Sequence, residues 1–196
     1  QSNWNGLTGR IELLATDRIW ISDVQVYPDI RNKPARLLVT IGNAANRQVI
    51  GILTIAAKSW NTKRNHAPAT KSASFTASKS ETVVEVNYPM GDDVLLWDDL
   101  SPAMYSLTVS LNAAADDKTF NNEKTVTFGM REIGTKGTQF TINNRPTFLR
   151  GTLECCIFPL TGYPPTDVEE WLRILRVAKA HGLNHMRFHS WCPPEA

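Results

Sequence analysis

The protein has 196 residues, of which 42% are hydrophobic and 20% charged, a composition typical of a globular protein with a buried core. Its 21 basic and 19 acidic side chains are scattered along the whole length and give a formal net charge of +2. Without a basic stripe, the sequence gives no sign of a nucleic-acid or lipid surface, and no apolar run approaches the roughly 20 residues that span a bilayer.

The first residues do not have the signals of a natural terminus. Gln1-Ser2-Asn3 is similar to what a protease leaves after removing a purification tag, and no charged-then-apolar secretory signal opens the chain. We therefore expect an engineered start, followed by a short β-prone run over 10–15.

Residues 10–128 have the pattern of short strands separated by polar turns. From Ser22 onward Val24 and Val26 share one face, although Ile21 breaks the alternation, and Val84 and Val86 share a face in the same way. Turns are expected at 31–34 and at Gly42-Asn43, and a solvated loop over 58–71. The predicted strands are 10–15, 20–28, 36–41, 49–56, 82–88, 104–111 and 124–128.

A series of about seven short strands with no helical periodicity predicts an antiparallel β-sandwich of the immunoglobulin type. Within the strand over 104–111, the alternation places every second residue together on one face. These residues are Tyr105, Leu107, Val109 and Leu111.

The pattern changes near residue 150, where 148–151 is expected to end a strand. After a Pro- and Gly-rich loop, Thr166 and Glu169 have capping-box spacing and predict the start of a helix, and Gly182 predicts its end. The expected apolar stripe is Val168, Trp171, Leu172, Leu175 and Ala178. A further strand is predicted over 184–189. A strand–helix–strand unit needs more parallel strands to bury its faces, so we interpret it as the opening of an α/β barrel or open sheet.

The three cysteines indicate neither a disulfide nor a metal site. Cys155 and Cys156 are adjacent and point to opposite faces of a strand, and no CxxC spacing or helical pair of His is present. No cofactor is expected.

The cysteines do not decide the cellular compartment, because buried thiols persist in oxidising compartments. We favour a periplasmic or secreted location over the cytoplasm. The sequence stops abruptly with Cys192-Pro193-Pro194-Glu195-Ala196, from which we expect a longer parent protein.

Several segments together resemble glycoside hydrolase family 2, the group of β-galactosidases, β-glucuronidases and β-mannosidases. The Phe-Gly-x-Arg stretch at 128–131, followed by the Arg-Gly strand end at 150–151, is the most specific of them. The other similar segments are 5–13, 21–29, 95–97 with Pro102 and Tyr105, and 140–146.

The resemblance implies a mainly β fold of three parts. Residues 1–18 would hold the tag remnant and the exit segment of a preceding sugar-binding-like domain, and 19–135 an immunoglobulin-like β-sandwich. Residues 136–196 would be the first strand–helix–strand of a truncated (β/α)₈ TIM-barrel catalytic domain. The implied activity is β-galactosidase-like, a retaining hydrolysis of O-glycosidic bonds in carbohydrates. Both catalytic glutamates would lie on later barrel strands, so the fragment is expected to be inactive and to pack against other domains of its own chain.

Barrel enzymes place their chemistry at the C-terminal ends of the strands, which selects the candidate site residues. By resemblance, Arg187 matches an Arg that supports the catalytic carboxylate, although a buried Arg tied to barrel carboxylates is an open alternative. His189 is offset by one position from the family's sugar-binding His, where Ser190 aligns instead. Trp191 is a candidate for stacking on a sugar ring, and Glu154 is a candidate for reaching the sugar from the first strand's loop.

Two alternatives remain open at this point. A non-catalytic carbohydrate-binding or adhesion sandwich would explain residues 1–135 but not the capped helix and the last strand, and a degenerate barrel without glutamates would serve only as a scaffold. Trp20, Trp60 and Trp97 are interpreted as core or interdomain packing rather than sugar platforms. His185 is expected to fill the barrel interior, and His66 and His181 are not candidates.

Overall fold

The computed structural model describes residues 11–115 and 117–194. The chain divides into two compact units, Ala15–Pro146 and a second unit that includes the described residues from Thr147 onward. The segment 1–10, which contains the expected tag remnant and part of the expected exit segment, lies outside the described residues, and the domain boundaries expected from the sequence remain predictions. No helix among the described residues is long and apolar enough to cross a membrane.

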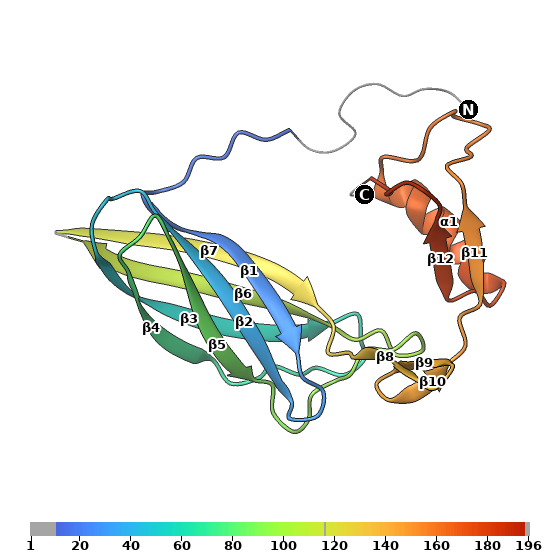
Figure 1. The fold of residues 1–196 in the computed structure, drawn as a ribbon, viewed down its shortest axis with the longest axis horizontal. Coiled ribbons are helices and arrows are strands. Elements are labelled where there is room, and N and C mark those ends of the chain that lie inside the picture. The colour runs from blue at the N-terminus through green and yellow to red at the C-terminus, as the bar shows by residue number, and fades with distance from the viewer. Residues whose placement is uncertain (1–10, 116, 195–196) are drawn as a thin grey trace. The chain divides into compact units, whose positions relative to one another are not determined.

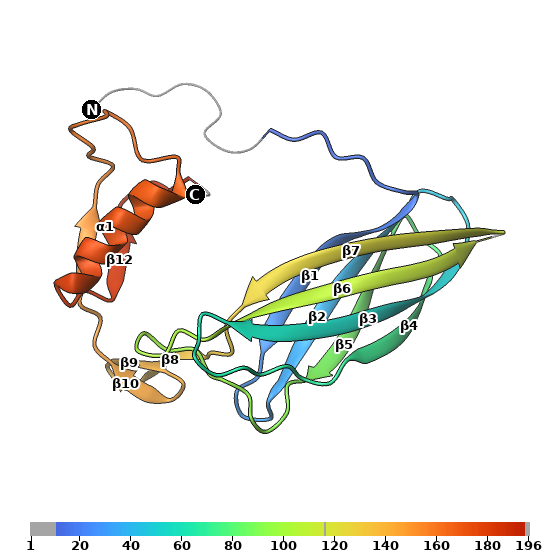
Figure 2. The ribbon, with the colours of Figure 1, turned by 180° about the vertical axis from the view of Figure 1, so that it is seen from behind.

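Seven antiparallel strands of the first unit form two sheets that enclose one core (Figures 1 and 2). The three-stranded sheet has the order β1-β2-β5 and the four-stranded sheet the order β4-β3-β6-β7. Their bounds are β1 Ile19–Pro28, β2 Pro34–Asn43, β3 Val49–Trp60, β4 Lys71–Ala77, β5 Glu81–Pro89, β6 Met104–Ala115 and β7 Lys118–Phe128. The predicted sandwich is therefore confirmed.

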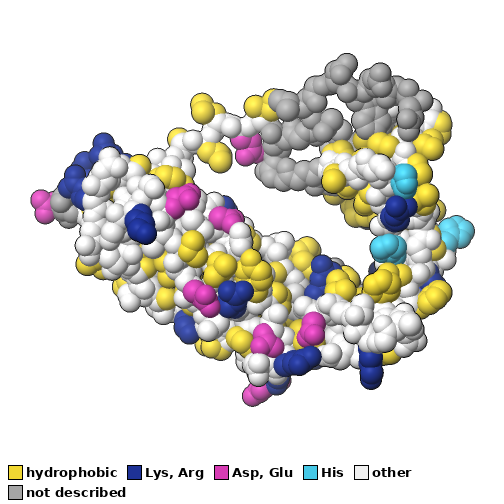
Figure 3. Space-filling view, viewed as in Figure 1, with side chains coloured by type: hydrophobic (Ala, Val, Ile, Leu, Met, Phe, Trp, Pro, Cys, Tyr) yellow, Lys and Arg dark blue, Asp and Glu magenta, His cyan; other side chains and the backbone are white. Residues whose placement is uncertain are grey.

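Side chains at every second position fill the core. Leu37, Val39 and Ile41 of β2 are fully buried, and they face a second buried row from β6. That row is Tyr105, Leu107, Val109 and Leu111, as the alternation predicted. On the outer face of the three-stranded sheet, charged side chains of both signs lie among hydrophobic ones (Figure 3).

A β-bulge explains why Ile21 breaks the alternation of the first strand. Ile21 pairs with Ile41, whereas Asp23 pairs with the preceding residue of β2, so Ser22 is the extra residue. Both Ile21 and Val24 are consequently buried although three positions separate them. Side chains of β7 hold the bulge: Asn122 Oδ1 accepts the Ile21 N–H at 2.9 Å, and Lys124 Nζ donates to the Ser22 carbonyl at 2.6 Å.

The turn expected at Gly42-Asn43 was wrong, because both residues belong to β2. The chain turns after them, where Asn46 has a φ of 57°. The Asn43 side chain supports this turn, donating to the carbonyls of Arg47 and Ala77 and accepting the Ala45 N–H. Gly42 is small for a different reason: a Cβ there would lie 2.4 Å from the indole ring of Trp20.

The expected strand over 10–15 was also wrong. Its described residues have no regular secondary structure, and Ile11, Leu13 and Leu14 are exposed. The seventh strand is instead β4, which pairs with β3 and had been missed. The loop expected over 58–71 is shorter and covers residues 61–70, because β3 extends to Trp60 and β4 begins at Lys71.

Tyr105, near the start of β6, joins the sandwich to an upstream loop. Its hydroxyl accepts the backbone N–H of Leu95 at 2.9 Å and shares a 2.7 Å hydrogen bond with His66 Nδ1. Burial raises the pKa of Tyr105, so the hydroxyl stays protonated at neutral pH. A tyrosine at this place that bonds back to the upstream backbone is a recurrent feature of immunoglobulin-like sandwiches.

A small sheet follows the sandwich, in the order β10-β9-β8. Its strands are β8 Ile133–Lys136, β9 Gln139–Ile142 and β10 Arg145–Thr147. Trp97 anchors the segment that leads from β7 to this small sheet. The backbone N–H of Trp97 donates to the Met130 carbonyl, and the Arg131 guanidinium lies 4.6 Å from the centre of the Trp97 ring. Trp97 therefore has a packing role against Arg131, as expected.

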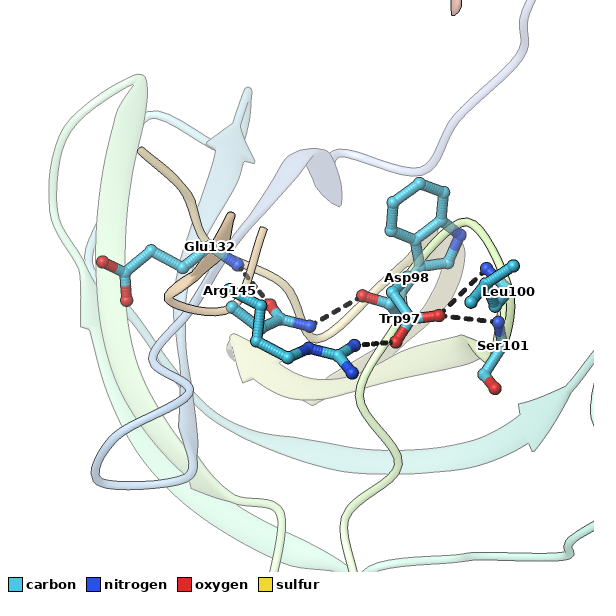
Figure 4. A network of polar contacts seen from close by, with 7 residues as sticks. Trp97, Asp98, Leu100, Ser101, Glu132 and Arg145 are labelled. Atoms are coloured by element: carbon cyan, nitrogen blue, oxygen red, sulfur yellow. Dashed lines mark hydrogen bonds and ion pairs between the residues drawn. The ribbon is translucent and has the colours of Figure 1, made fainter. Parts of the chain in front are cut away.

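Polar contacts attach the small sheet to the 97–101 loop (Figure 4). Asn143 donates to the Trp97 carbonyl and exchanges two hydrogen bonds with the backbone of Glu132. Arg145 forms an ion pair with Asp98. Burial tends to raise the pKa of Asp98, but the Ser101 and Leu100 N–H groups and the Arg145 charge lower it below its ordinary value.

The second unit is a parallel strand–helix–strand, visible in Figures 1 and 2. It consists of β11 Gly151–Glu154, α1 Val168–Ala180 and β12 His185–Phe188, and Gly151 pairs with His185 at the start of the parallel ladder. Residues 148–150, expected to belong to the first strand, precede it.

The predicted helix is present, but its N-cap residue differs from the expected one. Asp167 and not Thr166 caps the helix, accepting the Glu170 N–H at 2.9 Å. Gly182 ends the helix with a φ of 76°, as predicted. Within the expected apolar stripe Trp171 is buried, whereas Val168 and Leu175 are exposed, so α1 has apolar surface left uncovered in this chain.

Candidate functional site

The two parallel strands have one covered and one open face. Phe188 lies on the covered face, where its ring contacts Trp171 of α1 with ring centres 6.0 Å apart. Because side chains alternate, Glu154 shares this helix-side face through its pairing with Phe188. Leu153 and Arg187, which are paired in the ladder, lie on the opposite face and are exposed.

Each strand is followed by a residue in the left-handed region. Two residues beyond the end of β11, Cys156 has a φ of 61°, and two residues beyond the end of β12, Ser190 has a φ of 63°. Such conformations cost a non-glycine residue roughly 1–3 kcal/mol and cluster at functional sites. The strand ends are therefore the part of this unit where the backbone itself suggests a function.

Glu154 makes hydrogen bonds with both its carboxylate and its carbonyl. One carboxylate oxygen accepts the Cys156 N–H at 2.9 Å and the other accepts the Ile157 N–H at 3.1 Å. The carbonyl accepts the His189 N–H at 2.9 Å and the Trp191 indole N–H at 3.2 Å. The same residue thus binds both segments that follow the strands. Burial and then the Glu154 charge raise the pKa of the Cys156 thiol.

Trp191 belongs to a cluster of four aromatic rings in edge-to-face contact. Its ring lies 5.2 Å from Phe188 and 6.1 Å from Phe158, and Phe158 in turn contacts Trp171. The indole of Trp171 donates to the Pro165 carbonyl. Phe158 was not among the predicted site residues, because a single aromatic residue in a Pro- and Gly-rich loop has no periodicity that would reveal its partners.

The remaining predicted site residues lie at or next to the end of β12. Arg187 makes no hydrogen bond or ion pair with any residue that the structure describes. Ser190 and His189 are exposed, and the Ser190 hydroxyl lies 3.3 Å from His189 Nδ1. The structure thus brings His189, Ser190, Trp191 and Glu154 together, while Arg187 lies on the open face.

The other features weighed from the sequence lie elsewhere. Trp60 ends β3 and is half exposed, and Trp20 packs over Gly42. The described residues contain no group of three or more His, Cys, Asp or Glu placed to hold a metal ion.

A cavity of about 520 Å³ lies at one end of the sandwich, next to the hairpin that joins β6 to β7. Phe120 contributes a buried ring, while the acidic and basic side chains of the lining are exposed. Its lining residues are Asp17, Arg18, Ala45, Arg47, Ala115, Asp117, Lys118, Thr119 and Phe120. This mixture of charges selects no class of ligand.

The model of glycosyl hydrolases family 2 matches residues 19–131, which is more than half of the chain. The chain belongs to this family. No curated protein matches the sequence.

Solved structures of family 2 members are similar to this chain. A member from Bacteroides cellulosilyticus has a TM-score of 0.70 at 23% identity, with 91% of this chain and 24% of that chain covered. A β-galacturonidase from Eisenbergiella tayi bound to galacturonate has a TM-score of 0.70 at 16% identity, covering 91% and 30%. β-Glucuronidase 2 from Bacteroides uniformis has a TM-score of 0.69 at 16% identity, covering 92% and 22%. At these identities the likeness shows the fold alone, and the chain spans less than a third of the length of each.

Proposed function

We propose that this family 2 chain is part of a retaining β-glycosidase that hydrolyses O-glycosidic bonds of carbohydrates. In this proposal β11, α1 and β12 are the first strand–helix–strand of a (β/α)₈ barrel, and the substrate binds beyond the C-terminal ends of the strands. The observation that carries the proposal is the open face of the parallel pair, on which Arg187 is exposed. Parallel strands occur almost only where both faces are covered, so further strands and their side chains belong on this face.

Two further observations support the barrel. Ala15–Pro146 make up about two thirds of the chain, so a match to family 2 structures that covers 91% of it extends into the strand–helix–strand unit. The second unit also exposes large apolar side chains, among them Phe148, Ile157 and Leu160, which a complete domain would bury.

Arg187 is proposed to support a carboxylate supplied by another barrel strand. A guanidinium stays charged at neutral pH and bonds a carboxylate through two N–H groups. On the open face the Arg187 charge has no partner among the described residues. This fits a side chain whose partner lies on another strand of the proposed barrel. His189, Ser190 and Trp191 are proposed to contact the sugar.

The retaining reaction needs two carboxyl groups about 5 Å apart, one as nucleophile and one as acid/base. Among residues 147–194 Glu154 is the carboxylate at the strand ends, and the others, Asp167, Glu169 and Glu170, belong to the first turn of α1 and its cap. We therefore assign both catalytic carboxyl groups to other strands of the barrel.

The test uses a polypeptide that carries this chain together with the rest of the catalytic domain. It is assayed on aryl β-galactosides, β-glucuronides and β-galacturonides, and the configuration of the first-formed sugar is followed by NMR. We expect hydrolysis of at least one glycoside with retention, and a fall in kcat of about 100-fold or more in Arg187→Ala. Arg176→Ala, which removes an exposed arginine of α1, is the matched control. Inversion, or no hydrolysis of any β-glycoside, would contradict the proposal.

The 196-residue chain alone gives a second test. Because its described residues place one carboxyl group, that of Glu154, at the strand ends and not a pair, it is expected to release no aryl alcohol above the buffer rate. Hydrolysis that survives repurification would show that the carboxyl groups have been assigned wrongly.

A further inference from the structure

We infer that Glu154 is a positioning residue that fixes Trp191 and the loop after β11, and that its carboxylate is not a substrate ligand. This inference deepens the proposed function, on which it rests for the identity of the site. It replaces the role in sugar binding that the sequence suggested for Glu154.

The direction of the side chain gives the first argument. Glu154 lies at the end of β11 on the face covered by α1, since its ladder partner Phe188 packs against Trp171. In the proposed barrel that face is the outer one, and substrate lies toward the opposite face and the strand ends. Arg187, on the opposite face, has the direction that a substrate-side residue requires.

The hydrogen bonds of the carboxylate give the second argument. Its two oxygens accept the N–H groups of Cys156 and Ile157 at 2.9 and 3.1 Å. Cys156 is held at a φ of 61°, a conformation that needs local stabilisation in a non-glycine residue. Charge-assisted bonds from a carboxylate to two successive N–H groups supply that stabilisation, as they do at a helix N-cap.

The carbonyl of the same residue gives the third argument. It accepts the His189 N–H, which continues the parallel ladder by one step, and the indole N–H of Trp191 at 3.2 Å. Trp191 is also held by edge-to-face contacts with Phe158 and Phe188. If the carboxylate releases the loop, the carbonyl and Phe158 both move, and Trp191 loses two of its three supports.

Three variants separate positioning from substrate contact. Glu154→Ala removes the carboxylate. Glu154→Asp keeps it one methylene shorter, and an Asp accepts N–H groups two and three residues ahead just as well. A positioning role is therefore rescued by Asp, whereas a carboxylate that touches the sugar withdraws by about 1.5 Å and is not rescued. Glu169→Ala, which removes an exposed carboxylate from α1, is the matched control.

The first measurement uses the 196-residue chain and needs no activity. The ¹⁵N–¹H resonance of the Trp191 indole is assigned with Trp191→Phe, and its exchange with water is followed. We expect exchange at least about tenfold faster in Glu154→Ala, and wild-type exchange in Glu154→Asp and Glu169→Ala. Unchanged exchange in Glu154→Ala would overturn the inference.

The second measurement uses the polypeptide with the complete catalytic domain. We expect kcat/KM to fall about tenfold or more in Glu154→Ala, mainly through KM, and to stay within about threefold of wild type in Glu154→Asp. Equal loss in both variants would overturn the inference in favour of a sugar contact. If the wild-type polypeptide hydrolyses no glycoside, the proposed function fails, while the indole measurement still decides the role of Glu154.

Discussion

The indole ring of Trp20 in β1 lies over the backbone of Gly42 in β2, so close that a Cβ on Gly42 would be 2.4 Å from two ring atoms. A flexible side chain would move aside at little cost, but a half-buried indole is a rigid ring with few other rotamers on a strand. This pair explains the glycine within β2, where it has no turn to form.

We predict that Gly42→Ala lowers the free energy of unfolding by about 1–3 kcal/mol, because the methyl group displaces the Trp20 ring. The measurement is urea denaturation followed by tryptophan fluorescence. In a Trp20→Ala background the same change is expected to cost less than about 1 kcal/mol, since the obstacle is gone. An equal cost in both backgrounds would contradict the prediction.

We predict that Tyr105→Phe costs about 1–3 kcal/mol of stability. The variant keeps the buried ring but leaves the Leu95 N–H and His66 Nδ1 without the hydroxyl. Tyr27→Phe is the control, because the Tyr27 hydroxyl bonds to Gln25 in an exposed position and its loss is expected to change stability by less than about 0.5 kcal/mol. Equal effects of the two substitutions would show that the buried hydroxyl of Tyr105 contributes no more to stability than the exposed hydroxyl of Tyr27.

We predict that stability falls at acid pH in part through Asp98. Its pKa in the folded protein lies below the unfolded value of about 3.9, so the contribution is present above about pH 4 and is lost as pH falls through the folded-state pKa. The difference in unfolding free energy between wild type and Asp98→Asn should therefore be larger at pH 7 than at pH 2.5. The control, Asp93→Asn, removes an exposed carboxylate that has no hydrogen bond or ion pair with described residues. A difference that stays constant with pH would rule out this role.

We predict that backbone amides of residues 150–194 exchange hydrogen faster than those of β2, β3 and β6 in the 196-residue chain. The second unit has a two-stranded sheet with one open face, whereas the strands of the sandwich lie in larger sheets around one core. Mass spectrometry of peptides after timed labelling measures the difference. Protection in β11 and β12 equal to that in β3 would mean that the unit is complete without further strands.

Much of the sandwich was predictable because alternation is a local property. Any strand that buries one face repeats its apolar residues every second position, so the buried row of Leu107, Val109 and Leu111 was found without knowing its neighbours. The helix over 168–180 and its end at Gly182 were found in the same way from spacing and a glycine.

The errors arose where pairing between distant segments decides the outcome. Apart from Lys71 and Phe75, the strand Lys71–Ala77 consists of small and hydroxylated residues with little apolar signal, and it forms by pairing with the edge of β3. The apolar run at 11–15 has the signal of a strand but pairs with none.

The sequence by itself determined which faces are buried, where the chain changes from strands to a strand–helix–strand, and which residues follow the two parallel strands. Only the tertiary structure decided that Glu154 points to the helix side and Arg187 to the open face, and that Asn122 and Lys124 hold the bulge at Ser22. The physical reason is range: burial patterns follow from neighbours in the chain, whereas ladder pairings and side-chain bonds across about a hundred residues exist only once the chain has folded.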